Sequence, residues 1–379
     1  MNRKTIQPIR IMGSQFFARA LRSVRLKVFA SAALSCLLCS AAMMAANDPP
    51  FLPTQVRAVS TVPGNGDVNP YGVAFVPPGF PTGGAINPGD ILVSNFNNFM
   101  NLQGTGTTIV DVPSTQPVFQ YFGGTAPLGL TTALNILTKG FVLVGNFPST
   151  DGTCQNSSAG SILVIDKNGN LVSTITDPMI QGPWDSALFD EFGRAKFFVS
   201  NGLNGTVIRL DLAVNQSGVS VKNITEIASG YTFQCDPVTF VDAPTGLVYD
   251  PRKDVLYVAS TGDNAVYAVY GAAERTHDAG RGMLIYTDSK HLHGPLGLTM
   301  APNGDLLTSN NDAINSDPSQ PSEIVEFTIE GKFVKQISMD PAQGGAFGLA
   351  VQTMGQNAQF AAVDDNTDLF LIWTFNFPW

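Results

Sequence analysis

The chain has 379 residues, of which 13% are charged and 44% hydrophobic, and it contains 37 Gly and 25 Pro. This composition excludes a coiled coil, which is rich in Ala, Glu, Lys and Leu, and a disordered chain, which lacks the apolar residues for a core. A charge-poor chain with many turn residues and many Val, Phe and Thr predicts short strands joined by turns.

The first 46 residues differ in charge from the rest. They contain seven basic residues and no acidic one, and the 19 residues over 28–46 are uncharged and rich in Ala, Ser and Leu. A basic segment, an apolar stretch and then small residues predict a secretory signal peptide over 1–46, cleaved between Ala41 and Asn47. The alternative is an uncleaved membrane anchor, because the uncharged stretch is just long enough to span a bilayer. We therefore expect an exported protein, periplasmic or extracellular.

The chain after this segment is acidic. Residues 47–379 hold 14 of the 21 Lys and Arg residues and all 30 Asp and Glu residues, which corresponds to a net charge of −16. Such a surface repels phosphate groups, so we expect no nucleic-acid partner, and no membrane contact except through an uncleaved signal segment. A monomer is expected.

One short phrase returns six times in this part of the chain. Its fourth residue is Gly in every copy except the third, where Asp185 stands, and this position recurs at intervals of 57, 56, 61, 51 and 51 residues. An apolar strand ending in small polar residues follows each phrase, then a third strand and, in several copies, an amphipathic fourth. The phrases begin at Asn69, Ala126, Gly182, Ala243, Gly294 and Gly345.

Four short strands in units of roughly 40–60 residues are typical of β-propeller blades. The sequence therefore predicts an all-β, six-bladed β-propeller that forms one domain over 47–379. The six units predict a closed ring, because each blade buries its faces only against its neighbours. The last copy ends after three strands, so we expect the alternating stretch 55–62 to supply the missing outer strand and close the ring.

The repeat pattern resembles two related groups of propellers. The Pro-x-Gly-Leu turns, the Pro302-Asn303-Gly304 hairpin and the strands ending in Ser-Asn are similar to the NHL-repeat propellers and to the gluconolactonase–regucalcin superfamily. The resemblance covers essentially all of 55–379. Because it lies in the repeat pattern, it implies the fold more strongly than an activity.

Polar side chains are predicted at one mouth of the central channel. The first strand of a blade starts at this face and the second returns to it, so both bring their ends together there. With the Asp residues of the following hairpins, these side chains form an acidic, Asn-rich face that suits a polyhydroxylated ligand or a hard cation. The alternative is that they stabilise their own turns. The predicted ligand-binding residues are Asn95, Asn146, Asp185, Asn201, His291, His293, Asn310 and Asp364.

Asp364 and Asp185 are the predicted metal ligands, for a divalent cation such as calcium. Asp364-x-Asn366-x-Asp368 has the spacing of a calcium loop, but Leu369 replaces the glycine of such loops and no Glu follows, so a polar hairpin is the alternative.

His291 and His293 lie two residues apart in the connection before the fifth repeat. On an extended segment their rings would point the same way and could share a ligand or metal. The alternative is a solvated loop.

Cys154 and Cys235 are the two cysteines outside the signal segment. They fall in two connections on the channel face, and in an oxidising compartment they predict one disulfide that joins two long loops. The alternative, a nucleophilic thiol, has no motif to support it.

Two functions remain open. The resemblance to gluconolactonases implies a divalent-metal-dependent lactonase or hydrolase, whose Glu, Asn and Asp hold a metal that polarises the lactone and activates water. Gln181 stands where that Glu is expected, the expected Asn is replaced, and only Asp364 matches the Asp. One matched ligand of three favours the other function, an NHL-like module that binds a small polar molecule or a protein through the channel face.

Overall fold

The computed structural model describes residues 51–52, 57–113, 117–319, 321–355 and 357–376. The predicted signal peptide and its cleavage site lie outside these residues. The described part of the chain includes no helix that could span a membrane.

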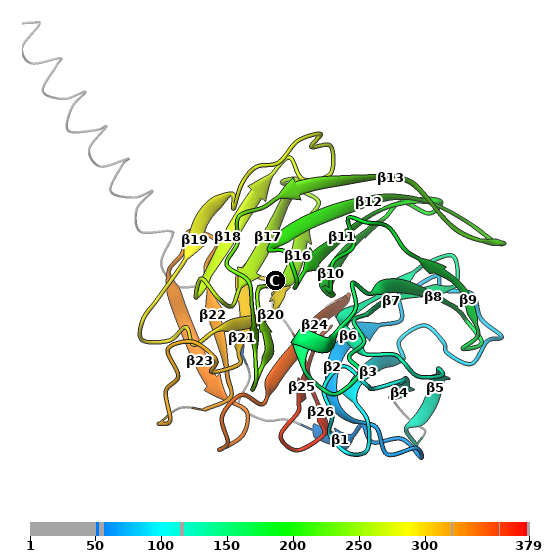
Figure 1. Cartoon of the computed structure of the whole chain (residues 1–379), viewed down its shortest axis with the longest axis horizontal. Coiled ribbons are helices and arrows are strands. Elements are labelled where there is room, and N and C mark those ends of the chain that lie inside the picture. Colours follow the sequence, from blue (N-terminus) through cyan, green and yellow to red (C-terminus); the bar gives the residue numbers. More distant parts are fainter. Residues whose placement is uncertain (1–50, 53–56, 114–116, 320, 356, 377–379) are drawn as a thin grey trace, which may run out of the picture. The chain divides into compact units, whose positions relative to one another are not determined.

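Six four-stranded antiparallel sheets follow one another around a central axis (Figure 1). Blade 1 contains β2 (Val68–Phe75), β3 (Ile91–Asn97), β4 (Thr108–Asp111) and β5 (Phe119–Gly123). Blade 2 contains β6 (Leu130–Leu137), β7 (Phe141–Asn146), β8 (Ser161–Asp166) and β9 (Leu171–Ile175). Blade 3 contains β10 (Pro183–Asp190), β11 (Arg194–Asn201), β12 (Thr206–Asn215) and β13 (Gly218–Ala228).

The second half of the ring repeats this order. Blade 4 contains β16 (Pro244–Asp250), β17 (Val255–Ser260), β18 (Ala265–Tyr270) and β19 (Met283–Tyr286). Blade 5 contains β20 (Pro295–Met300), β21 (Leu306–Asn310), β22 (Glu323–Phe327) and β23 (Phe333–Ser338). Blade 6 contains β24 (Ala346–Met354), β25 (Asn357–Asp364) and β26 (Leu369–Asn376), and β1 (Arg57–Ser60) is its outer strand.

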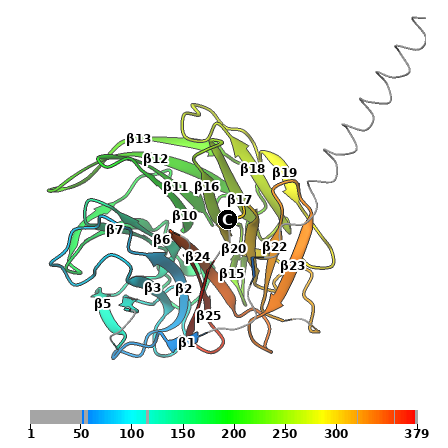
Figure 2. The ribbon, with the colours of Figure 1, turned by 180° about the vertical axis from the view of Figure 1, so that it is seen from behind.

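The pairing of β1 with β26 closes the ring. The two strands are antiparallel, with Ser60 opposite Leu369, and the inner strands of blades 6 and 1 contact each other. Figure 2 shows the six inner strands around the axis from behind. The predicted six-bladed propeller, closed by a strand from the N-terminal side, is confirmed.

The cores lie between the blades. All residues of β7 are buried, and successive side chains of a strand point to opposite faces. Val142 accordingly belongs to the same apolar cluster as Leu92 of blade 1, and Leu143 to that of Phe197 of blade 3. Each blade therefore needs both neighbours to bury its faces, which is why the ring must close.

The repeat glycines allow the inner strands to approach each other. A Cβ at Gly348 would collide with the carbonyl oxygen of Tyr71, and one at Gly297 with that of Phe347. Thr132 and Asp185 occupy this level in blades 2 and 3. In blade 2, Leu130 rather than Pro127 is opposite the terminal Asn146. The second copy of the phrase is thus displaced by three residues from the sequence alignment, and Gly129 lies before the strand.

Candidate functional site

The axis is filled by aromatic rings near the face where the inner strands begin. The rings of Tyr71 in blade 1 and Trp184 in blade 3 meet across the axis with their centroids 5.7 Å apart. All six rings are at most 4% exposed, so they close the channel at this end. We call this cluster the aromatic plug; it consists of Tyr71, Phe96, Phe147, Trp184, Phe240 and Phe347.

One ring of the plug comes from a hairpin between blades 3 and 4. Strands β14 (Gln234–Asp236) and β15 (Phe240–Asp242) pair, and Asp236 Oδ1 accepts hydrogen bonds from the N–H groups of Val238 and Thr239 at the turn. Phe240 then packs 5.2 Å from the rings of both Phe96 and Phe147. The hairpin therefore covers the end of the channel.

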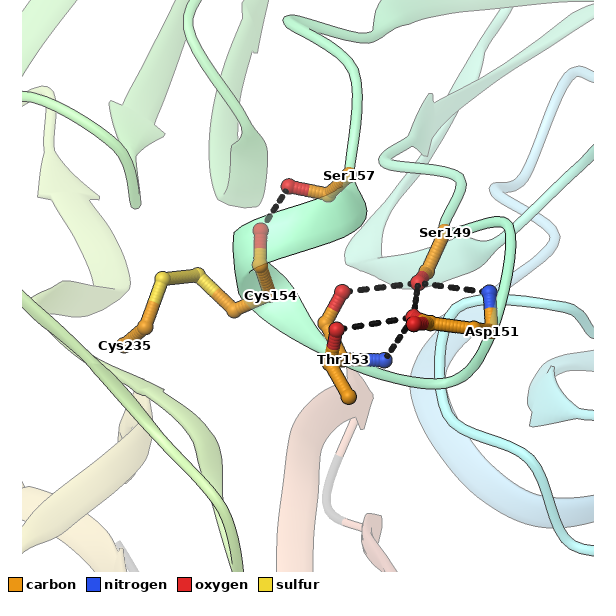
Figure 3. Close-up of a disulfide and its surroundings, with 6 residues drawn as sticks. All are labelled: Ser149, Asp151, Thr153, Cys154, Ser157 and Cys235. Carbon is orange, nitrogen blue, oxygen red and sulfur yellow. Dashed lines mark hydrogen bonds between the residues drawn. A yellow bond between two sulfur atoms is a disulfide. The ribbon is translucent and has the colours of Figure 1, made fainter.

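A disulfide holds this hairpin to blade 2. Cys235 is bonded to Cys154 in the short 3-10 helix η1 (Cys154–Asn156), and the Cα atoms are 5.4 Å apart (Figure 3). The loop before η1 is ordered by Asp151, whose Oδ1 accepts hydrogen bonds from the N–H and Oγ1 of Thr153. The predicted disulfide is confirmed.

The four predicted asparagines are buried and bonded within the fold. Oδ1 of Asn146, Asn201 and Asn310 accepts the N–H of Gly129, Gln181 and His293, respectively, in the chain segment that enters the same blade. Asn95 donates to the carbonyl oxygen of Thr61. These contacts give the asparagines a role in shaping the blade entrances. Their role in binding a ligand stays a prediction, which these contacts do not support.

The two predicted histidines have separate partners. His293 is 2% exposed, and its ring nitrogens face the carbonyl oxygens of Asn315 and Lys290. His291 Nδ1 lies 2.6 Å from Asp288 Oδ2, and its ring stacks on Phe333. Each ring thus has its own partners within the protein, and a shared ligand stays untested.

Asp364 ends β25 and belongs to a polar hairpin. Its Oδ2 accepts the hydroxyl of Thr367 and its Oδ1 the N–H of Asn366. Burial, with the nearby carboxyl of Asp340, raises the pKa of Asp364 to about 6. Asp368 instead accepts the N–H of Asn69. The carboxylates of this segment therefore point to different partners, as the polar-hairpin alternative predicts.

The residues present do not fit a gluconolactonase-type metal. Gln181 donates from its side chain to the carbonyl oxygen of Pro178. In the described part of the chain, no three His, Cys, Asp or Glu side chains are placed to hold an ion together. Metal binding by Asp185 and Asp364 stays a prediction without support from this geometry.

Beyond the plug, the channel widens into a cavity of about 420 Å³. The plug and the cavity meet between adjacent residues of the inner strands. Trp184 and Phe347 belong to the plug, and the residues that follow them, Asp185 and Gly348, line the cavity. All six inner strands contribute to the wall. Its polar residues are Thr132, Asn135, Thr138, Asp185, Ser186, Asp190 and Thr299, among aliphatic side chains and the rings of Phe75 and Tyr249.

Asp185 lies at the closed end of this cavity. Its Oδ1 accepts the N–H of Ser186 at 2.7 Å and its Oδ2 the N–H of Leu247 at 3.2 Å. Burial raises the pKa of the Asp185 carboxyl well above its usual value, although both hydrogen bonds favour the charged form. Carboxyls with such shifts in a concave site are candidates for function.

Sequence reasoning found Asp185 as the exception among the repeat glycines, but it did not find the cavity. The cavity walls include apolar residues that follow the repeat glycine, such as Val73 and Leu298, and in the sequence these look like ordinary core residues. Phe240 carried no signal either, because it lies between repeats. Asp185 was predicted at the Asn-rich mouth, and the structure places it beyond the plug, in the lining of the cavity.

The comparisons with known proteins concern the fold. No family model and no curated protein matches the sequence. A gluconolactonase from Xanthomonas campestris matches with a TM-score of 0.52 at 13% identity, over 87% of this chain and 96% of that one. A luciferin-regenerating enzyme matches with 0.50 at 13% identity, over 84% and 95%. A provisionally assigned oxidoreductase (glucose dehydrogenase) from Thermus thermophilus also matches with 0.50 at 13%, over 85% and 100%.

At this identity the likeness shows the fold alone. The fold that the sequence pattern implied, that of the gluconolactonase-like six-bladed propellers, is thereby confirmed.

Proposed function

We propose that the protein is an exported binding propeller that takes a small organic molecule into the cavity of its central channel. The observation that carries this proposal is the cavity of about 420 Å³, which is walled by all six inner strands and ends at Asp185. Ligand sites of proteins are typically concave and combine apolar walls with a few polar groups, and this cavity is concave and lined by both kinds of residue.

The aromatic plug determines where the ligand enters. Because the plug and the β14–β15 hairpin close one end, the ligand must enter from the opposite face. This differs from the acidic, Asn-rich face of the sequence-based hypothesis, whose amides are bonded within the blades. A closed end also suits a small molecule better than a segment of a polymer that would have to pass through the channel.

Export is supported by the disulfide. A bond between Cys154 and Cys235 persists in an oxidising compartment, which agrees with the signal peptide predicted over 1–46. The net charge of −16 over 47–379 argues against a nucleic-acid partner. In the described part of the chain, no set of side chains is placed to hold the metal ion that a gluconolactonase-like lactonase would need.

Binding can be tested with N-phenyl-1-naphthylamine, a neutral apolar probe whose fluorescence rises in an apolar site. Titration of the purified protein should give saturable binding of one probe per chain. Ala350 lines the cavity and packs with the axial cluster, so Ala350→Phe should fill the cavity and abolish binding. Ala350→Leu should weaken it, whereas Ala85→Phe, on an exposed loop, should leave it unchanged.

Circular dichroism of each variant checks that the propeller is folded. Equal probe binding by folded Ala350→Phe and by the unmodified protein would place the probe elsewhere and defeat the proposal. Absence of probe binding to the unmodified protein would also count against it.

A further inference from the structure

We infer that the ligand of the channel is an organic cation, with an apolar body and an ammonium group that reaches the carboxylate of Asp185. This inference rests on the proposed function and specifies the ligand class of the same cavity. It follows from the charges that line the cavity, from the free acceptor sites of Asp185 and from the character of the walls.

All charged residues that line the cavity are acidic. They are Asp185 and Asp190, and the lining includes no Lys, Arg or His. Tyr249 is the other titratable residue of the lining, and its hydroxyl donates to Asp254. Two carboxyls within apolar walls attract a cation and repel an anion, because the surrounding protein focuses their field into the cavity.

Asp190 is already satisfied by the protein. Its Oδ2 accepts both the N–H and the hydroxyl of Thr138 at 2.7 Å, and its Oδ1 accepts the N–H of Phe192 at 3.0 Å. These three hydrogen bonds occupy most of the acceptor sites of the Asp190 carboxylate. Asp190 therefore holds the chain turn after β10 rather than a ligand.

Asp185 differs because each of its oxygens accepts only one backbone N–H. An ionised carboxylate has about four acceptor sites, so about two remain for a ligand. None of the ion pairs formed by the described residues includes Asp185. A half-buried carboxylate that faces a cavity is less well hydrated than one on the surface, and an ammonium group would compensate its charge.

The two N–H groups also orient the carboxylate. Ser186 is adjacent on β10, whereas Leu247 belongs to β16 of the next blade, so both blades hold Asp185 in one position. Binding of an ammonium group favours the charged form of the carboxyl, which burial disfavours. Cation binding and ionisation of Asp185 should therefore favour each other.

The walls select the rest of the ligand. Aliphatic side chains of all six blades and the rings of Phe75 and Tyr249 surround the space in front of Asp185. An apolar or aromatic body would replace water along these walls, and the rings can also contact a cation favourably.

Three probes of similar size test the inference: 2-phenylethylamine, 2-phenylethanol and phenylacetate, each titrated by calorimetry and by displacement of N-phenyl-1-naphthylamine. The amine should bind at least about tenfold more tightly than the alcohol, and phenylacetate should bind least, as expected for a charge pair in a partly buried site. Asp185→Asn should remove the advantage of the amine and leave the affinity for the alcohol within about twofold.

Glu330→Gln is the matched control, since it removes one exposed acidic group that does not line the cavity and should leave the amine affinity unchanged.

The outcomes separate the two proposals. If the alcohol binds as tightly as the amine, or if Asp185→Asn leaves the amine affinity unchanged, the cation inference is overturned, while probe binding that depends on Ala350 still supports the channel as a binding site. If neither N-phenyl-1-naphthylamine nor any of the three ligands binds, the proposed function fails together with the inference.

Discussion

The carboxylate of Asp185 accepts a hydrogen bond from the backbone N–H of Leu247, 3.2 Å away on the inner strand of the next blade. Four of the other five blades have glycine at the level of Asp185, because a Cβ there would meet the neighbouring strand. At Gly246, for example, it would meet the carbonyl oxygen of Leu296. Blade 3 thus places a carboxyl in a ring position that Gly occupies in blades 1, 4, 5 and 6. This substitution sets the chemistry of the cavity.

Removal of the disulfide should destabilise the protein. The bond joins residues 81 positions apart, so its loss in the double variant Cys154→Ser/Cys235→Ser should lower the free energy of unfolding by about 2–4 kcal/mol. Urea denaturation measures the change. A reducing agent should shift the midpoint of the unmodified protein towards that of the variant and leave the variant unchanged; equal midpoints from the start would contradict the prediction.

The plug depends on Phe240, which is 1% exposed. Phe240→Ala removes ring contacts with Phe96, Phe147 and Trp184, and it should cost about 3–5 kcal/mol of unfolding free energy. Phe99, which is 70% exposed, provides the matched control, since Phe99→Ala should change stability by less than about 0.5 kcal/mol. Similar losses in both variants would show that the hairpin is not packed on the axis.

Asn201 should contribute to stability rather than to binding. Its side chain holds the N–H of Gln181, the carbonyl oxygen of Met179 and the hydroxyl of Thr206. Asn201→Ala should therefore lower the unfolding free energy by about 1–3 kcal/mol. The dissociation constant of N-phenyl-1-naphthylamine should stay the same in the folded variant. A weaker affinity with unchanged stability would instead restore the Asn-rich face as the ligand site.

Stability should fall as the pH rises through the neutral range. Burial and the carboxyl of Asp312 raise the pKa of Glu323 to about 7, and burial and Asp340 raise that of Asp364 to about 6. The folded state therefore keeps protons that the unfolded state releases near its ordinary carboxyl pKa values, 4.5 and 3.8. Since the folded state binds more protons in this window, the free energy of unfolding decreases between about pH 4 and pH 7.

Urea denaturation at pH 5 and pH 7.5 measures this dependence. The midpoint should be higher at pH 5, and Glu323→Gln should reduce the difference because Gln does not titrate. The exposed control Glu330→Gln should leave the difference unchanged. A midpoint that rises from pH 5 to pH 7.5 in the unmodified protein would be the opposite of the expected sign.

The sequence by itself determined the propeller, because its information is local and repeated. Nearly every copy carries its own turn glycine, and every copy has its own apolar strands. The closing segment alternates between two kinds of side chain, as a β-strand does. The short last copy then leaves one place for β1, beside β26. The cysteine pair was predictable for a similar reason, since the repeat order puts both connections on one face.

Tertiary structure alone decided which end of the channel is open. Tyr71 and Trp184 are 113 positions apart, and their contact across the axis exists only once the ring has closed. Phe240 joins them from a hairpin outside the repeat, so the repeat pattern in the sequence gives no indication of its position. The asparagines at the strand ends were predictable as a set, but whether their amides face a ligand or the backbone depends on the path of the entering chain. The sequence showed Asp185 as the one acidic residue at a repeat-glycine position. Only the packing of the six inner strands places it at the closed end of a cavity.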